Sequence, residues 1–400
     1  MESLRANGMK KKFRFHLLGL AHLPQSRKFF NCAFTQKNLK LAKMLTGLGH
    51  TVFFYGSEGS DVKEYCNSEN LHFVPTHTIA DIRRDYGVGD NRFDLGYDYV
   101  SGEFKNDLNT AKTPSTMQFY TRATEFIIKN KKNDDFLLVT QGYYHKPIAQ
   151  KVGLFLTVEP GVGYRGSYAS YRAFESSYIQ NFTYGSEHPR QSINGNYYDR
   201  VIPNYFDKDE FENVDLHNRE DYYLYIGRMI LRKGVWTAIK ATEAIGAKLI
   251  LAGQQDEEID IKTLPKHCTF IGTVNPERRK ELMSHAIATF VPSEYLEPFA
   301  GVHIESMLCG TPVITTNFGV FPETIPDNMN GIVGYRCNTL SDFVEAAEKA
   351  KRNALHNLIR NYGSRFLMET VALEYQKWFE DLYQLYRSAT IKGEKGWHHL

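Results

Sequence analysis

Residues 287–316 read IATFVPSEYLEPFAGVHIESMLCGTPVITT. The two ends of this stretch, residues 287–291 and 312–316, are short apolar runs typical of buried strands. Residues 300–309 are predicted to form a helix, and Pro298 suits a first helical turn, so we expect the helix to begin near that residue. A strand, a loop, a helix and a second strand in this order are typical of a parallel α/β sheet.

The start of this helix has groups that suit an anion. The amides of Ala300, Gly301 and Val302 are expected to point out of the helix N-terminus, where the helix dipole favours a phosphate. Glu297 and Glu305 are eight residues apart, or about 12 Å along a helix. That is about the distance from the sugar ring to the ribose of a nucleotide sugar, whose hydroxyl pairs can donate to a carboxylate at each end. Two such glutamates alone also fit a solvated helix face.

Strands and helices alternate along the whole chain, in two halves. In the first half, we expect strands at residues 13–20, 51–55, 136–140 and 154–158 and a helix at residues 33–48. In the second half, further strands are expected at residues 222–226, 247–252 and 268–271, and helices at residues 234–245 and 276–284. This alternation predicts parallel sheets with helices on both faces.

The division between the halves predicts the domain organisation. Residues 201–221 have the composition of an interdomain linker, and a long amphipathic helix is expected at residues 369–386. The predicted fold class is α/β, with two Rossmann-like doubly wound domains that face each other across a cleft. The first domain comprises residues 1–205 and the second comprises residues 206–369. The helical tail, residues 370–400, could cross back to the first domain. Ligands bind at strand carboxyl ends in such folds, so the cleft is the expected site.

The composition excludes several classes of protein. The chain has 400 residues and a net charge of +2, so nothing global requires nucleic acid or an anionic membrane, although peripheral membrane contact stays open. No apolar run reaches the ~18 residues of a membrane helix, and the polar start does not resemble a secretion signal. The five cysteines are scattered and form no metal-like pair. We therefore expect a cytoplasmic protein with reduced thiols and no bound metal.

A second motif, at residues 227–234, reads GRMILRKG. It follows a predicted strand and comes just before a predicted helix, so Arg228 and Lys233 can neutralise a diphosphate leaving group. An arginine and a lysine near a turn are also common as plain surface charges.

Together, these motifs resemble the retaining GT-B-fold glycosyltransferases of family 4, also called glycosyl transferases group 1. The E-x7-E region of that family corresponds to residues 297–305, and its G-R-x4-K-G motif to residues 227–234. Further matches, in the family's order, are residues 49–52, 202–204, 253, 272–274, 292–293 and the P-E pair at 322–323.

The resemblance implies a GT-B fold and the transfer of a hexosyl or pentosyl group to an acceptor hydroxyl from a nucleotide sugar, expected to be a UDP- or GDP-sugar. It also implies retention at the anomeric carbon by front-face attack, without a metal or a further cofactor. Arg228 and Lys233 would offset the diphosphate charge, Glu305 would hold the ribose, and Glu297 the sugar. The other donor-binding residues that it implies are Gly227, Gly253, Gly272, Val274, Ser293, Phe299, Ala300, Gly301 and Val302.

The loop after Leu20 departs from the family, because it has no glycine pair. His22, Arg27, Asn31 and Thr35 are the candidates for contacts with the acceptor or the donor in this region, and each is equally consistent with a solvated loop residue. Residues 76–114 are polar and have no period, so they are predicted to form an acceptor-side loop or a surface insertion.

Glu159 is a second departure, because many members of the family have a histidine after the corresponding strand. At a strand end in the cleft, its carboxylate could orient sugar hydroxyls, bind the acceptor or stabilise positive charge at the anomeric carbon, so Glu159 is a catalytic candidate. A structural carboxylate in a turn is the alternative.

Other functions stay open. A GT-B-fold epimerase or phosphorylase would use the same donor motifs, and a non-catalytic nucleotide-sugar-binding protein would keep them without turnover. Gly161, Gly163 and Gly166 have the spacing of a dinucleotide-binding loop, but they follow the late strands of the first half instead of its first strand. The acceptor (a glycan, a lipid-linked molecule or a protein) and the oligomeric state also stay open.

Overall fold

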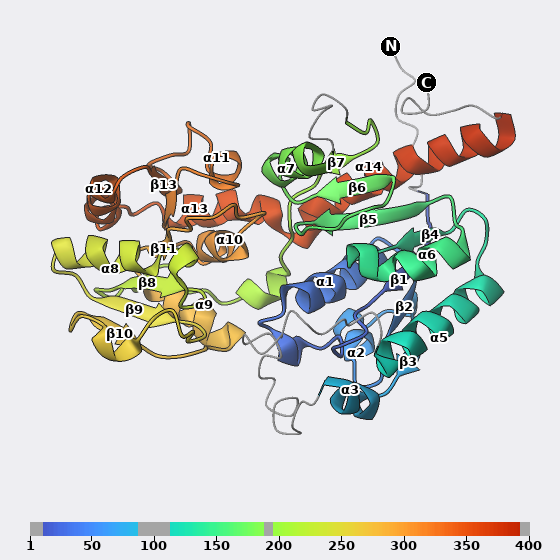
Figure 1. The fold of residues 1–400 in the computed structure, drawn as a ribbon. Coiled ribbons are helices and arrows are strands. Elements are labelled where there is room, and N and C mark those ends of the chain that lie inside the picture. Colours follow the sequence, from blue (N-terminus) through green and yellow to red (C-terminus); the bar gives the residue numbers. More distant parts are fainter. Residues whose placement is uncertain (1–10, 87–112, 188–194, 393–400) are drawn as a thin grey trace, which may run out of the picture.

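The computed structural model describes residues 11–86, 113–187 and 195–392. These residues form two α/β domains, each built on one sheet, and a long C-terminal helix that runs along the first domain (Figure 1). Every strand pair in the described residues is parallel.

The first domain has a seven-stranded sheet in the order β3-β2-β1-β4-β5-β6-β7. Its strands are β1 (Arg14–Leu18), β2 (Thr51–Ser57), β3 (Leu71–His77), β4 (Phe136–Leu138), β5 (Thr157–Val162), β6 (Tyr171–Phe174) and β7 (Arg200–Val201). The helices are α1 (Ala33–Gly47), α2 (Val62–Cys66), α3 (Ile79–Tyr86), α5 (Pro114–Asn130), α6 (Lys146–Val152) and α7 (Ser177–Glu187), with short 3₁₀ turns η1 (Arg27–Phe29) and η3 (Gly142–His145).

Helices cover both faces of this sheet, which is why most residues of the central strands β1, β2 and β4 are buried. Successive residues of a strand point to opposite faces. Leu17 of β1 accordingly packs with α1 and the C-terminal helix, whereas Leu18 packs with α5 and α6.

The second domain has a six-stranded sheet in the order β10-β9-β8-β11-β12-β13. Its strands are β8 (Tyr223–Ile226), β9 (Leu249–Ala252), β10 (Cys268–Phe270), β11 (Thr289–Val291), β12 (Val313–Thr316) and β13 (Gly334–Cys337). The helices are α8 (Val235–Ala244), α9 (Pro276–His285), α10 (Gly301–Leu308), α11 (Phe321–Thr324), α12 (Leu340–Ala350) and α13 (His356–Gly363), with 3₁₀ turns η4 (Lys208–Phe211), η5 (Leu231–Lys233), η6 (Ile261–Thr263) and η7 (Ser364–Phe366).

The strand order reverses once in each sheet. β1 lies between β2 and β4, and β8 lies between β9 and β11. Loops that leave the carboxyl ends of such neighbouring strands go to opposite faces of the sheet and leave a crevice between them. The loops after β1, β4, β8 and β11 are therefore where ligands are expected.

The chain crosses between the two domains twice, and the two crossings lie side by side. Phe206 on the outward passage and Leu367 on the return form a parallel bridge, in which Phe206 N donates to Phe366 O and Met368 N donates to Phe206 O. The return passage continues as α14 (Met368–Arg387), followed by a turn of π-helix, η8 (Ser388–Lys392). Trp378 and Phe379 of α14 are buried in the core of the first domain.

The predicted fold class is confirmed by the two parallel sheets, but four strands, β3, β6, β7 and β13, were not predicted. β7 has only two residues, which are too few to form a sequence pattern. β6 and β13 are short, and each contains an arginine that interrupts the apolar run. Arg172 of β6 is buried and pairs with Asp199 and Glu187, and Arg336 of β13 pairs with Asp327. β3 contains Pro75, which an edge strand tolerates.

β3 also corrects the prediction of one long loop at residues 76–114. Residues 76 and 77 end β3, α3 follows at Ile79–Tyr86, and α5 begins at Pro114. Residues 87–112 of the predicted loop lie outside the described residues.

β5 begins and ends later than predicted, at Thr157–Val162 instead of residues 154–158. Its pairing with β6 shifts register between Glu159 and Val162, and this irregularity accommodates Pro160 and Gly161 inside a strand. Glu159 therefore lies within β5 and not at its end.

Among the described helices, none is both long and apolar enough to cross a membrane.

Candidate active site

Glu297 lies in the loop between β11 and α10, and its exposed fraction is 3%. Its Oε1 accepts hydrogen bonds from Lys233 Nζ (2.6 Å) and Ser293 Oγ (2.7 Å), and its Oε2 accepts one from Tyr295 OH (2.8 Å). Burial alone would lower the pKa of Lys233, but the charge of Glu297 outweighs it, so the pKa is raised and the lysine stays protonated. Two predicted catalytic residues, Lys233 and Glu297, are thus in direct contact.

α10 begins at Gly301, later than the expected start near Pro298. The residue before it, Ala300, is in the left-handed region with φ 59° and ψ 63°, and the preceding Phe299 is buried in the core of the second domain. No side chain caps α10. The first amides of the helix, at Gly301 and Val302, are therefore open to an anion.

The same turn also changes the spacing expected between the two glutamates. The left-handed turn at Ala300 ends the loop and starts the helix, so Glu297 precedes α10 and Glu305 lies within it. A spacing of about 12 Å along a helix does not describe this pair.

Three predicted donor-site glycines follow neighbouring strands at this edge of the sheet. Gly227 follows β8, Gly253 follows β9, and Gly272 follows β10. Gly253 N donates to Gly272 O at 2.8 Å, and a Cβ on Gly253 would lie 1.9 Å from Gly227 O, so only glycine fits there. Arg228, next to these turns, is half-buried and has no side-chain hydrogen bond or ion pair within the described part of the chain. Its charge is available to an anion.

Glu305 on α10 has an exposed fraction of 8%, and only one of its carboxylate oxygens has a partner among the described residues. Its Oε1 lies 3.3 Å from Arg279 Nη2 of α9, whereas its Oε2 is buried and has no hydrogen-bond partner among the described residues. A buried acceptor without a donor is costly, so this atom is suited to a ligand hydroxyl. Val274 lies in the loop between β10 and α9. It packs against the hydrophobic core of the second domain that also contains residues of α10, the helix of Glu305.

Glu159 is fully buried in the first domain. It accepts hydrogen bonds from Tyr164 OH (2.8 Å), Tyr168 N (2.9 Å) and Ala169 N (3.2 Å). Burial raises its pKa despite these donors. The carboxylate thus holds the loop between β5 and β6, and its bonds are all within the first domain.

The four candidates after β1 have different surroundings. Arg27 is exposed and pairs with Asp61, with Nε 3.5 Å from Oδ2. Asn31 is exposed just before α1, whereas Thr35 is buried in the first turn of that helix, and its Oγ1 has no partner among the described residues. His22 lines a pocket.

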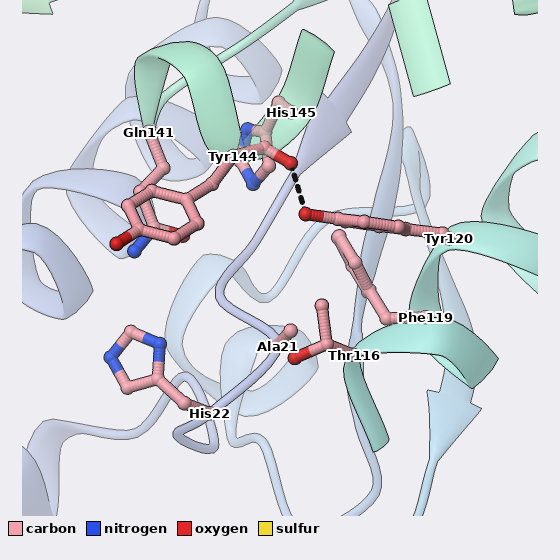
Figure 2. A pocket seen from close by; sticks show the side chains of 8 residues that line it. All are labelled: Ala21, His22, Thr116, Phe119, Tyr120, Gln141, Tyr144 and His145. Atoms are coloured by element: carbon pink, nitrogen blue, oxygen red, sulfur yellow. Dashed lines mark hydrogen bonds between the residues drawn. The ribbon is translucent and has the colours of Figure 1, made fainter. Parts of the chain in front are cut away.

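Figure 2 shows this pocket, at the carboxyl ends of β1 and β4. It is lined by uncharged side chains only: Ala21, His22, Thr116, Phe119, Tyr120, Gln141, Tyr144 and His145. Burial lowers the pKa of His22 to about 4 and that of His145 to about 3, so both rings are neutral at pH 7. The cavity volume is about 10 Å³, which is room for about one water.

His145 is held in place by two hydrogen bonds of its ring. Its Nδ1 accepts from Thr140 N at 3.1 Å, and its Nε2 lies 3.0 Å from Gly19 O, to which it donates. Figure 2 also shows the bond from the Tyr120 hydroxyl to the carbonyl of Tyr144. Hydrogen bonds therefore hold this wall of the pocket, while His22 faces it from the loop after β1.

Two residues of the donor side escaped sequence prediction. Tyr295 stands two positions before Glu297, and its hydroxyl donates to that carboxylate. A hydroxyl so close in the sequence to a predicted carboxylate is a signal that could have identified it. Arg279 had no such indication, because a charged residue on a polar helix is ordinarily solvated. Within the described ranges, no group of three or more His, Cys, Asp or Glu side chains is arranged to hold a metal ion.

Comparison with known proteins identifies the second domain. Residues 207–365 match the family described as Glycosyl transferases group 1. An uncharacterized glycosyltransferase of Methanocaldococcus jannaschii is 33% identical over 136 residues, which are 32% of this chain and 35% of that protein. The chain spans about a third of the length of the curated relatives that it matches.

Solved structures extend the likeness to the whole fold. Sucrose-phosphate synthase from Thermosynechococcus elongatus has a TM-score of 0.62 at 17% identity, over 93% of this chain and 100% of that one. HepE of Anabaena, solved in complex with UDP-glucose, has a TM-score of 0.58 at 14% identity, over 93% and 100%. The chain therefore has the GT-B fold, and its residues 207–365 form a Glycosyl transferases group 1 domain.

Proposed function

We propose that this protein is a glycosyltransferase that moves a sugar from a nucleoside-diphosphate sugar to an acceptor hydroxyl. The observation that carries the proposal is the contact of Lys233 with Glu297 beside the uncapped start of α10. It joins a protonated amine, a buried carboxylate and free helix amides, which suit a phosphate and the sugar attached to it.

The donor binds along the carboxyl edge of the second sheet. Its diphosphate lies against the N-terminus of α10, between Arg228 and Lys233. An ammonium group has three protons, so Lys233 keeps its bond to Glu297 while it donates to a phosphate oxygen. The open Oε2 of Glu305 accepts from the ribose hydroxyls, and Glu297 accepts from a hydroxyl of the sugar.

The reaction proceeds with retention and without a metal. Arg228, Lys233 and the helix dipole offset the charge that develops on the leaving diphosphate, which is the largest electrostatic demand of the step. The acceptor attacks from the face that the diphosphate leaves, and a phosphate oxygen takes the proton of the acceptor hydroxyl. Glu159 shapes the first domain's loop instead of serving as a nucleophile, because three donors already occupy its carboxylate.

The acceptor approaches from the first domain, beside the pocket of His22. The lining of that pocket is uncharged, which favours an uncharged polar group such as a glycan hydroxyl over a phosphate. A UDP-sugar is the favoured donor, because HepE was solved with UDP-glucose and has the same fold.

The test is a panel of UDP-, GDP- and ADP-sugars, screened by thermal shift and then by transfer to glycan acceptors. We expect one donor to raise Tm and to be consumed with release of the nucleoside diphosphate. A labelled sugar found in a new glycosidic bond separates transfer from epimerisation and phosphorolysis. Binding without transfer to any acceptor, and with hydrolysis no faster than in buffer, would contradict the proposal and support a non-catalytic binder.

A further inference from the structure

The helix α7 of the first domain meets the second domain at its N-terminus (Figure 1). Glu323 of α11 accepts hydrogen bonds from the backbone N–H groups of Ser177 and Tyr178, each at 2.8 Å. These are the first two residues of α7, so a carboxylate of one domain caps a helix of the other. The P-E motif that contains Glu323 has no part in the donor site described above.

Three further contacts surround this cap. Ser176 Oγ donates to Pro298 O at 2.7 Å, and the rings of Tyr178 and Phe318 meet edge-on with centroids 5.6 Å apart. Leu296 packs against a small apolar cluster of the first domain. We call these residues the latch: Ser176, Ser177 and Tyr178 in the first domain, and Leu296, Pro298, Phe318 and Glu323 in the second.

The second-domain side of the latch encloses Glu297. Leu296 and Pro298 are its neighbours in the chain, and each contacts the first domain. The loop that leads to Glu323 also touches it, because a Cβ on Gly319 would lie 3.3 Å from Glu297 N. A movement of the latch therefore moves the main chain at Glu297.

The cap formed by Glu323 is more exposed than the contact that Asp207 makes in the linker. Ser177 and Glu323 are both exposed. By contrast, Asp207 in the linker is buried, and it accepts from Lys43 Nζ of α1 at 2.5 Å and from Tyr65 OH at 2.6 Å. Exposed polar contacts are weak and reversible, so the latch is the contact that opens first.

We propose that Glu323 is a positioning residue that holds the two domains closed through α7 and thereby fixes the main chain at Glu297. The inference rests on the proposed function only for what Glu297 binds, since closure is a property of the free protein. Donor binds best to the closed form, and opening lowers the apparent affinity in proportion to the closed fraction.

The experiment compares the full chain with Glu323→Ala, Glu323→Gln and a matched control, Asp342→Asn. Asp342 also accepts two consecutive backbone N–H groups, from Asn338 and Thr339, but within the second domain. Amide hydrogen exchange at residues 177–178, small-angle scattering and the kinetics of donor use are measured. Glu323→Ala is expected to speed exchange at residues 177–178 by roughly fivefold, the factor that corresponds to a typical helix cap.

The same variant is expected to enlarge the scattering envelope and to lower kcat/KM, mainly through a higher KM for the donor. Glu323→Gln keeps one acceptor and is expected to restore part of each effect, whereas Asp342→Asn changes exchange only at residues 338–339. Unchanged exchange and scattering in Glu323→Ala would overturn the latch. Opened domains with an unchanged kcat/KM would overturn the positioning role. A wild type without transferase activity would refute the proposed function, and exchange and scattering would still decide the latch.

Discussion

Lys233 is the residue on which the proposed donor site depends most, because it contacts Glu297, the carboxylate proposed for the sugar, and would also contact the diphosphate. Its bond to Glu297 is short at 2.6 Å, and three donors compensate the buried charge of Glu297. The proposed site is therefore organised before a donor would bind, and the proposed reaction would require little reorganisation.

Lys233→Ala is expected to lower kcat/KM at least ~100-fold, because a cation at the leaving group is lost. Ser293 and Tyr295 still donate to Glu297 in this variant, so the fold is retained. Steady-state kinetics with the donor identified by thermal shift measure the effect. Lys248→Ala is the control, since Lys248 is exposed at the amino end of β9. Near-wild-type turnover of Lys233→Ala would refute the assignment of the site.

Glu305→Gln is expected to raise the Kd for the donor about tenfold, the effect of losing a charged hydrogen bond to the ribose. Arg279→Ala is expected to have a smaller effect in the same direction, because Arg279 orients Glu305 from 3.3 Å. Arg278→Ala serves as the control, since Arg278 pairs with Glu281 on the surface. Titration calorimetry measures the affinities, and equal values for Arg278→Ala and Arg279→Ala would contradict the role of Arg279.

Lys233, Glu297 and Glu305 could be predicted as candidate site residues because they belong to ordered motifs that resemble a known family. The contacts of Arg279 and Glu323 could not be predicted, because their partners, Glu305 and the start of α7, are brought close only by the fold. A charged residue on a helix looks the same in the sequence whether it is solvated or bonded to a distant segment.

At the scale of elements, the start of α10 depends on the left-handed turn at Ala300. An alanine with φ 59° is strained, because its Cβ crowds the following carbonyl. Glycine adopts this conformation without strain. The later helix start could not be predicted from Pro298, since the turn that overrides it is made by an ordinary residue.

Ala300→Gly is expected to raise the free energy of unfolding by about 0.5 kcal/mol, after the greater freedom of glycine in the unfolded chain is allowed for. Ala300→Val is expected to lower it by at least about 1 kcal/mol, because a β-branched residue fits this conformation poorly. Urea denaturation measures both values. Changes of the same sign in the two variants would show that the turn is not strained.

Element boundaries follow the same logic. β1, α1 and α14 could be predicted to within a residue or a few, because long apolar patterns define them. β6 and β13 could not, since each contains an arginine whose acidic partner lies elsewhere in the chain. Short strands that contain a charged residue paired with a distant residue are therefore not recognised from the apolar pattern of the sequence.

At the scale of the whole molecule, each domain contains a fully buried neutral histidine. Burial lowers the pKa of His145 in the first domain to about 3 and that of His303 in the second to about 4. An unfolded chain protonates these rings near the ordinary value of 6.5, so below that pH it binds more protons than the folded protein. Stability therefore falls as the pH falls from 6.5 towards 4.

The fall is expected to reach about 1.4 kcal/mol per pH unit for each such histidine. Urea denaturation at pH 7 and at pH 5 measures it. His303→Gln removes one titrating ring while retaining a polar group beside Thr324, so its stability is expected to depend less steeply on pH. A slope equal to that of the wild type would exclude His303 as a source.

Trp378 of α14 tests how much the returning helix contributes to the first domain. It is buried, and its Nε1 donates to Tyr198 O at 2.8 Å. Trp378→Ala is expected to lower the free energy of unfolding by about 3–5 kcal/mol. Leu373→Ala on the same helix, where the side chain is 52% exposed, is expected to change it by less than about 0.5 kcal/mol. Equal losses in thermal denaturation would contradict the packing of α14.

The return of α14 also sets an order of events during synthesis. The core of the first domain includes both Phe15 and Phe379, whose ring centroids lie 4.7 Å apart, so it cannot be completed until the ribosome has made the chain beyond residue 379. The core of the second domain needs only residues 206–366. We therefore expect the second domain to fold while the first still waits for its last helix, which reverses the order of the domains in the sequence.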